Sequence, residues 1–112
     1  MISKIKNFVN TRNGDTLNPL TFTFKSGGAE ANISSWEFYA SVNDFKGNEV
    51  EYYDMDEGCS IVDNKLVVDF GDKINIEAGK YQFFLKVYNS QSGYQTIMQG
   101  DFNVEPKRVN DR

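Results

Sequence analysis

Hydrophobic and polar residues alternate along most of this chain with a period of two. The alternation is clearest at 20–25, 36–43 and 81–88, where every second residue is apolar. Because successive side chains of a β-strand point to opposite faces, each run predicts a strand with one buried face. Weaker runs of the same kind occupy 49–53, 66–70 and 96–104.

The strongest runs also predict where the core lies. We expect its centre at six large or branched residues of shared parity: Trp36, Phe38, Tyr81, Phe83, Leu85 and Val87. Phe84 and Tyr88 lie on the opposite face of 81–88, so this strand is expected to be covered on both sides. The acidic run 49–53 is expected near a sheet edge, and Gly100 is expected to mark a bulge.

Turn residues separate these runs and predict the fold class. Gly, Asn and Asp pairs recur between them, and the four residues Ser90–Gly93 predict a hairpin loop between 81–89 and 94–101. About seven or eight short strands with turns between them are typical of an all-β domain. We therefore predict an immunoglobulin-like antiparallel β-sandwich of seven or eight strands.

The same pattern gives the domain organisation. A chain of 112 residues fits one domain. We assign the sandwich to 1–104 and a polar C-terminal tail to 105–112, where the sequence turns charged. Helical spacing occurs only at Ile2, Ile5, Phe8 and Val9, a segment too short and uncapped to favour a helix.

Composition and charge narrow the functional classes. Aromatic residues make up 14% of the chain, which favours strands. The net charge of −4 argues against binding nucleic acid through its phosphates. No internal disulfide can form, because the only cysteine is Cys59. Residues 1–6 lack the apolar stretch of a secretion signal that would have to follow them, and no run is apolar enough to span a membrane.

The inventory of reactive side chains argues against catalysis. The chain has no histidine, which removes the usual general base and histidine-paired nucleophiles. Cys59 follows an acidic run that disfavours a thiolate, and we expect a small, semi-buried residue there. Carboxylates crowd 49–57, but sequence proximity does not place two of them across a cleft. We expect no catalytic residue and no cofactor.

One acidic segment is a weak metal candidate. Asp54, Asp56 and Glu57 carry the alternating oxygen ligands that calcium loops use. The spacing misses the EF-hand pattern, because the glycine comes one position early and Lys65 stands in place of the bidentate glutamate. The favoured interpretation is a solvated acidic edge that discourages strand-to-strand aggregation.

Several aromatic residues are expected to face outward. They are Tyr39, Tyr52 or its neighbour Tyr53, Phe84, Tyr88 and Tyr94. Such a row of rings can anchor a protein interface or stack on sugars. We favour a protein interface, or a face covered by a neighbouring subunit, over a sugar platform.

The order of motifs along the chain resembles a known family. It starts with Asn13-Gly14-Asp15-Thr16 and continues through Ile33–Tyr39 to Ala78-Gly79-Lys80-Tyr81, which resembles the tyrosine corner of immunoglobulin folds. It closes with a strand at 94–104 that includes Gly100-Asp101-Phe102. Over about residues 12 to 104 the chain resembles the immunoglobulin-like domain at the start of phage baseplate upper proteins and in many small phage tail proteins.

The resemblance implies a function. It implies a non-enzymatic structural protein of a bacteriophage virion, assembled in the host cytoplasm and contacting other virion proteins or itself. The larger family members continue into receptor-binding regions where this chain ends, which favours attachment or decoration here. Two alternatives stay open: a carbohydrate-binding module that uses the exposed aromatic residues, for example on a host surface glycan, and a bacterial domain encoded by a host gene.

Overall fold

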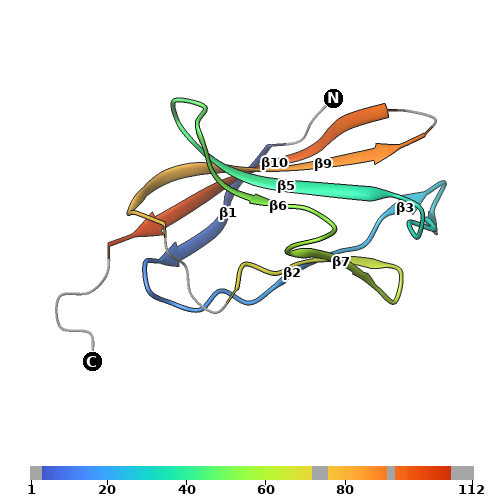
Figure 1. Cartoon of the computed structure of the whole chain (residues 1–112), viewed down its shortest axis with the longest axis horizontal. Helices are drawn as coiled ribbons and strands as arrows, with labels where there is room; N and C mark the ends of the chain where they lie inside the picture. Colours follow the sequence, from blue (N-terminus) through green and yellow to red (C-terminus); the bar gives the residue numbers. More distant parts are fainter. Residues whose placement is uncertain (1–3, 72–75, 91–92, 107–112) are drawn as a thin grey trace.

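The computed structural model describes residues 4–71, 76–90 and 93–106. Its strands form a five-stranded sheet of order β1-β10-β9-β5-β6, a three-stranded sheet of order β2-β8-β7 and a two-stranded ribbon β3-β4 (Figure 1). The strand bounds are β1 Lys4–Arg12, β2 Leu20–Phe22, β3 Lys25–Ser26, β4 Ala29–Glu30, β5 Glu37–Asp44, β6 Glu49–Tyr53, β7 Cys59–Val62, β8 Lys65–Val68, β9 Gly79–Asn89 and β10 Gly93–Glu105.

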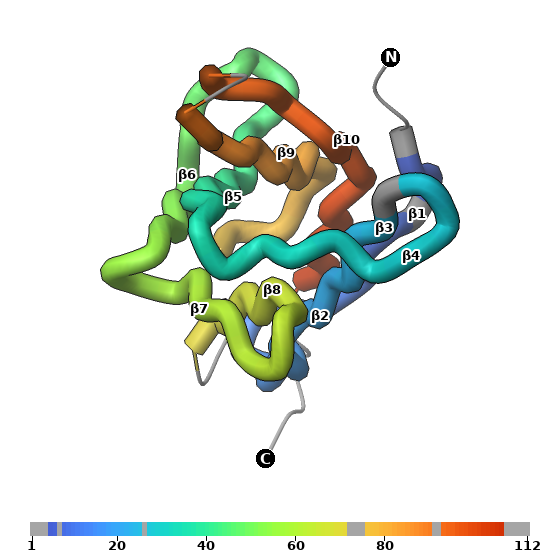
Figure 2. Tube along the Cα trace, turned by 90° about the vertical axis from the view of Figure 1, so that its right-hand side faces the viewer, coloured from blue at the N-terminus to red at the C-terminus, as the bar shows by residue number. Residues whose placement is uncertain are grey.

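The two sheets pack face to face as a sandwich, seen end-on in Figure 2 with β5, β9 and β10 above β2, β7 and β8. Along β5 and β9 every second side chain is buried, which is the alternation of the sequence. The fully enclosed side chains between the layers are Ile33, Phe38, Val42, Leu66, Val68, Phe83, Leu85 and Phe102. The predicted all-β sandwich is confirmed, and its two sheets together hold eight strands. No helix long and apolar enough to cross a membrane occurs in the part of the chain described.

The predicted core is correct except at Trp36. Five of the six expected residues are buried, but Trp36 is only half-buried and precedes β5. Its ring packs edge-on against Phe24, with the centroids 5.9 Å apart, and at a tilt against Phe38. Trp36 therefore closes one side of the core and does not stand at its centre.

Sequence patterning missed β1. This strand pairs in parallel with β10, whereas the other pairings are antiparallel. The register shifts between Ile5 and Val9, so the alternation is interrupted within the strand. Because of this irregularity, the apolar residues at the start of the chain are spaced as they would be in a helix. The described residues of this segment nevertheless form a strand.

Gly100 lies beside the register shift of the β1–β10 ladder, where Ile5 pairs with Gly100 and Val9 with Phe102, but it marks no irregularity of β10 against β9. The register between β9 and β10 shifts between Thr96 and Met98, which places the irregularity earlier. Gly100 is instead a point of close approach: a Cβ added there would lie 2.7 Å from the Cβ of Phe8. Glycine is required because the Phe8 side chain of β1 occupies that space.

The predicted tyrosine corner is present. The ring of Tyr81 is buried, and its hydroxyl donates a hydrogen bond of 2.7 Å to the backbone carbonyl of Glu77. This bond ties the segment before β9 to the strand itself. It satisfies a polar group at the edge of the core, as a buried hydroxyl requires.

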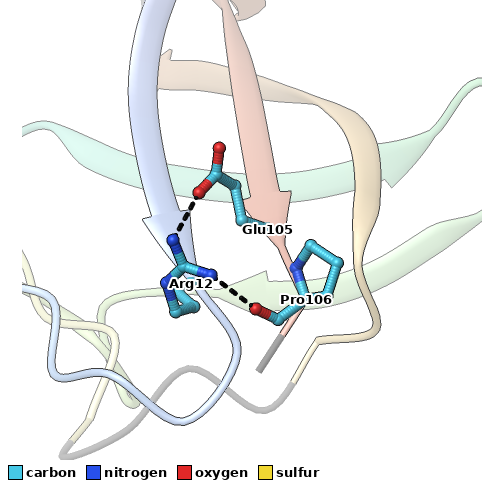
Figure 3. A network of polar contacts seen from close by, with 3 residues as sticks. All are labelled: Arg12, Glu105 and Pro106. Carbon is cyan, nitrogen blue, oxygen red and sulfur yellow. Dashed lines mark hydrogen bonds and ion pairs between the residues drawn. The ribbon is translucent and has the colours of Figure 1, made fainter. Parts of the chain in front are cut away.

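Arg12 joins the end of β1 to the end of its neighbour β10 (Figure 3). Its guanidinium donates to the carboxylate of Glu105 and to the carbonyl of Pro106, each at 2.7 Å. Strand β10 runs through Glu105, so the first two residues of the expected tail, 105–112, contact the domain. The remainder of that tail lies outside the described residues.

Candidate binding face

The outer face of the five-stranded sheet carries a cluster of four tyrosines. Alternation in β5 buries Phe38, Ala40 and Val42, so Tyr39 points away from the other sheet. By the strand register, Tyr88 of β9 pairs with Tyr94 of β10, while Tyr52 of β6 pairs with Ser41 next to Tyr39 along β5. We call Tyr39, Tyr52, Tyr88 and Tyr94 the tyrosine cluster.

The rings of the tyrosine cluster contact one another in a continuous chain. Centroid distances are 4.7 Å from Tyr88 to Tyr94, 5.8 Å from Tyr94 to Tyr39 and 6.4 Å from Tyr39 to Tyr52. These are the separations of interacting aromatic pairs. Tyr94 is 69% exposed and Tyr52 is 46% exposed, so the cluster is open to solvent across four neighbouring strands.

Acidic residues of β5 and of β6 and its flank border the cluster. Partial burial raises the pKa of Tyr39, and the nearby charge of Glu37 adds to the shift. Desolvation likewise raises the pKa of Tyr52, with further contributions from Asp54 and Glu49. The phenols therefore stay neutral at neutral pH. We call Glu37, Glu49 and Asp54 the acidic rim.

Phe84, the fifth predicted interface residue, stands apart from the cluster. It faces outward by alternation but is half-buried, between Ser41 of β5 and Gln99 of β10. No ring contact in the described part of the chain joins it to the four tyrosines. Beside Phe84, three polar side chains of β9 and β10 form a ladder of hydrogen bonds. The amide of Gln99 donates to Gln82 at 3.1 Å, and the amide of Gln82 donates to Asp101 at 3.0 Å.

The weak metal candidate is a backbone-bonded turn. One carboxylate oxygen of Asp54 accepts hydrogen bonds from the backbone N–H groups of Asp56 and Glu57, at 2.9 and 3.0 Å. This Asp54 oxygen is thus engaged by its own loop, as in an Asx turn. Across residues 4–71, 76–90 and 93–106, no three acidic or cysteine side chains are placed to hold a metal ion.

Cys59 is a packing residue at the start of β7. It is 3% exposed, and burial raises the pKa of its thiol to about 11, with Asp54 adding to the shift. A thiol in this environment is protonated at neutral pH and is a poor nucleophile. The structure thus places the side chain where the sequence predicted a small, semi-buried residue, although its burial is deeper.

Two apolar surface features escaped the sequence patterning. Phe45, in the turn between β5 and β6, is 85% exposed. An apolar groove of about 350 Å³ also opens beside Trp36, lined by aromatic and aliphatic side chains that include Phe22, Phe24, Ile97 and Met98. Phe45 falls in a segment recognised only as a turn, and the groove joins strands far apart in sequence, so no local signal predicted either.

Comparison with known proteins supports the fold. No protein-family model matches the chain, and no curated protein matches it. Among solved structures the chain is similar to CopC from Methylosinus trichosporium OB3b, with 16% identity and a TM-score of 0.51 over 91% of this chain and 88% of that chain. It also matches SGBP-B of the Bacteroides ovatus mixed-linkage glucan utilization locus, in complex with a mixed-linkage heptasaccharide, with 14% identity and a TM-score of 0.47 over 97% of this chain and 22% of that chain. The similarity to CopC shows the fold alone, an immunoglobulin-like β-sandwich.

Proposed function

We propose that this protein is a non-enzymatic structural component of a bacteriophage virion, used for attachment or decoration in the tail, baseplate or fibre. It docks on another virion protein through the tyrosine cluster. The motif order from Asn13 to Val104 supports the phage assignment by resemblance. The observation that carries the docking role is the exposed, continuous cluster on the outer face of the five-stranded sheet.

The cluster has the composition of a protein-binding surface. Tyrosine is enriched in interface hot spots, because a rigid ring buries a large area at a low cost in conformational entropy. The rings of the cluster also support one another before any partner arrives, which limits the side-chain ordering that association requires. The chain has no histidine, and the thiol of Cys59, in the other sheet, is buried.

The docking role is tested by removing one ring and measuring binding. Tyr94→Ser deletes the most exposed ring of the cluster, and Val62→Ser is the matched control, because Val62 is 53% exposed on the other sheet. We expect Tyr94→Ser to weaken capture of candidate tail proteins at least about tenfold, as loss of an interface hot spot does. Val62→Ser should bind normally. Equal binding by both variants would exclude the tyrosine cluster as the docking surface.

The virion location has its own test. Mass spectrometry of purified particles should detect the chain at a fixed ratio to the other tail proteins. Its absence from the particles would refute the virion role and favour a bacterial protein encoded by a host gene. The genes on either side of its coding sequence separate these two origins.

A carbohydrate-binding module is the second candidate function. The polar ladder of Gln82, Gln99 and Asp101 lies on the same face as the tyrosine cluster. Stacking rings beside amide and carboxylate groups is the combination that sugars require. A glycan array tests it, with tyrosine ring resonances in NMR as the second readout. Trp36 packs toward the core against Phe24, so tryptophan fluorescence is a poor reporter for this face.

A further inference from the structure

The carboxylates of the acidic rim make the tyrosine face electrostatically negative. Glu37 begins β5 and pairs in register with Tyr88, while Glu49 begins β6 and Asp54 follows β6, so the three carboxylates lie around the tyrosines of β5 and β6. Glu37 and Glu49 are exposed. The whole chain carries a net charge of −4, so the rim is not offset by a basic excess elsewhere. A partner that meets this side of the face has to compensate negative charge.

The rings attract the same kind of group. A cation over the face of a neutral tyrosine is attracted by the ring quadrupole, and arginine is the side chain that most often fills this position. Tyr39 and Tyr52 lie with their ring planes at 28° and their centroids 6.4 Å apart. A planar group between two rings needs about 7 Å, twice the usual carbon contact distance. A guanidinium would therefore lie over the exposed surfaces of this pair and not between them.

The positive charge of Lys86 disfavours binding of a cation on the β9 side of the cluster. It is exposed on β9 and pairs in register with Tyr39 of β5. Strand β6 lies beyond β5, so Tyr52 is two strands away from Lys86. Repulsion from Lys86 and attraction to Glu49 and Asp54, at the two ends of β6, act in the same direction. Both place a bound cation on the β5–β6 side, nearer Tyr52 than Tyr88.

We propose that the tyrosine cluster recognises a basic protein surface, with an arginine of the partner lying over Tyr39 and Tyr52 and attracted by the negative charge of the acidic rim. This inference rests on the proposed docking function and adds the chemistry of the partner. The tyrosine rings provide the contact area, and the acidic rim selects a partner of opposite charge.

A second copy of this face does not satisfy the same chemistry. In a two-fold dimer the same patch meets itself, so the acidic rims would approach each other. Like charges that face each other across an interface disfavour association. The partner is therefore a different protein with a basic surface.

The first experiment uses a minimal probe. A blocked Gly-Arg-Gly peptide is titrated against the intact chain while the tyrosine ring signals are followed by NMR, and a citrulline peptide of the same length is the uncharged control. We expect the arginine peptide to shift the Tyr39 and Tyr52 signals more than those of Tyr88, and citrulline to leave all of them in place. Equal shifts with both peptides, or none with either, would overturn the proposal.

Charge reversal tests the rim directly. Glu37→Lys combined with Glu49→Lys should abolish the arginine-induced shifts. Asp15→Lys combined with Glu77→Lys makes the same change in net charge at exposed positions away from the cluster and should leave the shifts intact. If both double variants lose the shifts equally, net charge and not the rim governs binding, and the proposal is wrong. Asp54 is left unchanged because its carboxylate holds the turn.

A virion protein captured by the intact chain separates this inference from the proposed function. Binding that Tyr94→Ser weakens supports the docking role. The rim variant should then weaken the same complex roughly tenfold, because two attractive exposed charges become repulsive, and added salt should weaken it as well. A complex sensitive to Tyr94→Ser but indifferent to the rim variant and to salt refutes the basic partner and keeps the docking role. Self-association that Tyr94→Ser abolishes also refutes it.

Discussion

Tyr81 shows how one side chain can both fill the core and fix a loop. Its ring is buried against the sandwich interior, while the hydroxyl donates to the carbonyl of Glu77 at 2.7 Å. Tyr81→Phe keeps the ring and leaves that carbonyl without this donor. We expect a loss of about 1 kcal/mol in the free energy of unfolding, measured by urea denaturation. Tyr88→Phe, a half-buried position on the outer face, is the control, and an equal loss there would contradict a specific role for the corner.

Cys59 makes stability depend on alkaline pH. Burial raises the pKa of its thiol from 9.0 to about 11, so the folded chain keeps this proton longer than the unfolded chain does. The contribution of the thiol to stability is complete below pH 9.0 and declines as the pH rises toward about 11. We expect the urea midpoint to fall over this range, and to fall less steeply in Cys59→Ala. Identical slopes in the two proteins would show that the thiol does not titrate as proposed.

Single residues were predictable where the signal is local. The tyrosine corner is a short motif, and glycine at position 100 does report a special backbone environment. The sequence could not reveal which environment, because the neighbour that excludes a side chain is Phe8, which is far away along the chain. Trp36 was misplaced for a related reason. Its size favours burial, but its position just before β5 leaves part of the ring uncovered.

At the scale of elements, Gly100 and Phe8 couple β1 to β10. Gly100→Ala would place a Cβ 2.7 Å from the Cβ of Phe8, closer than two carbons can pack. We expect a loss of about 1–3 kcal/mol in unfolding free energy from this overpacking. The double variant Phe8→Ala with Gly100→Ala tests the cause. In the Phe8→Ala background the added cost of Gly100→Ala should nearly vanish, and strict additivity would exclude the clash.

The β7–β8 hairpin gives a second element-scale prediction. Asp63 and Asn64 both have positive φ, at 51° and 60°, as a two-residue hairpin turn requires. The side chain of Asn64 also bonds outward, donating to the carbonyl of Ala31 at 2.7 Å and accepting from the backbone N–H of Ile33 at 3.0 Å. The Asn64 side chain thus holds the segment after β4 against the β7–β8 hairpin.

Replacing each turn residue separately distinguishes the backbone conformation of Asn64 from its side-chain hydrogen bonds. Asn64→Gly keeps the backbone conformation but removes the side-chain bonds, and we expect a loss of about 1–2 kcal/mol in unfolding free energy. Asp63→Gly, next to it in the same turn, should change stability by less than about 0.5 kcal/mol. Chemical denaturation of both variants is the measurement. Similar effects would mean that turn propensity, and not the bonds to Ala31 and Ile33, stabilises the hairpin.

Elements were predictable in proportion to their regularity. Strands β5 and β9 have unbroken alternation, and both were found with nearly correct bounds. Strand β1 contains a register shift, so a period of two could not identify it. The short strand β7 offers only Cys59 and Ile61 on its inner side, too few positions for a pattern. The parallel pairing of β1 with β10 joins opposite ends of the chain, which no local signal encodes.

At the scale of the whole molecule, the candidate site depends on pairing between distant strands. Tyr39, Tyr88, Tyr94 and one of Tyr52 and Tyr53 were expected to face outward; in the structure Tyr52 is exposed, while Tyr53 packs against the core. The convergence of the tyrosine cluster follows from the order β10-β9-β5-β6, which the sequence could not supply. The acidic run, which includes Tyr52, was likewise visible from the sequence, but its position beside Tyr39 of β5 is a consequence of the β5–β6 register, in which Tyr52 pairs with Ser41.

The sandwich separates stability from binding, and this separation can be measured. Phe38 is fully enclosed between the sheets and packs on Phe24 at 5.3 Å, so Phe38→Ala should cost about 3–5 kcal/mol in unfolding free energy. Tyr52→Ser combined with Tyr94→Ser removes two exposed rings from the outer face and should cost less than about 1 kcal/mol. Urea denaturation of both variants, with circular dichroism to confirm the β-sheet signal, tests the contrast. A loss above about 2 kcal/mol in the tyrosine variant would mean that the cluster is part of the folding core, and that the face it covers is not free to serve a partner.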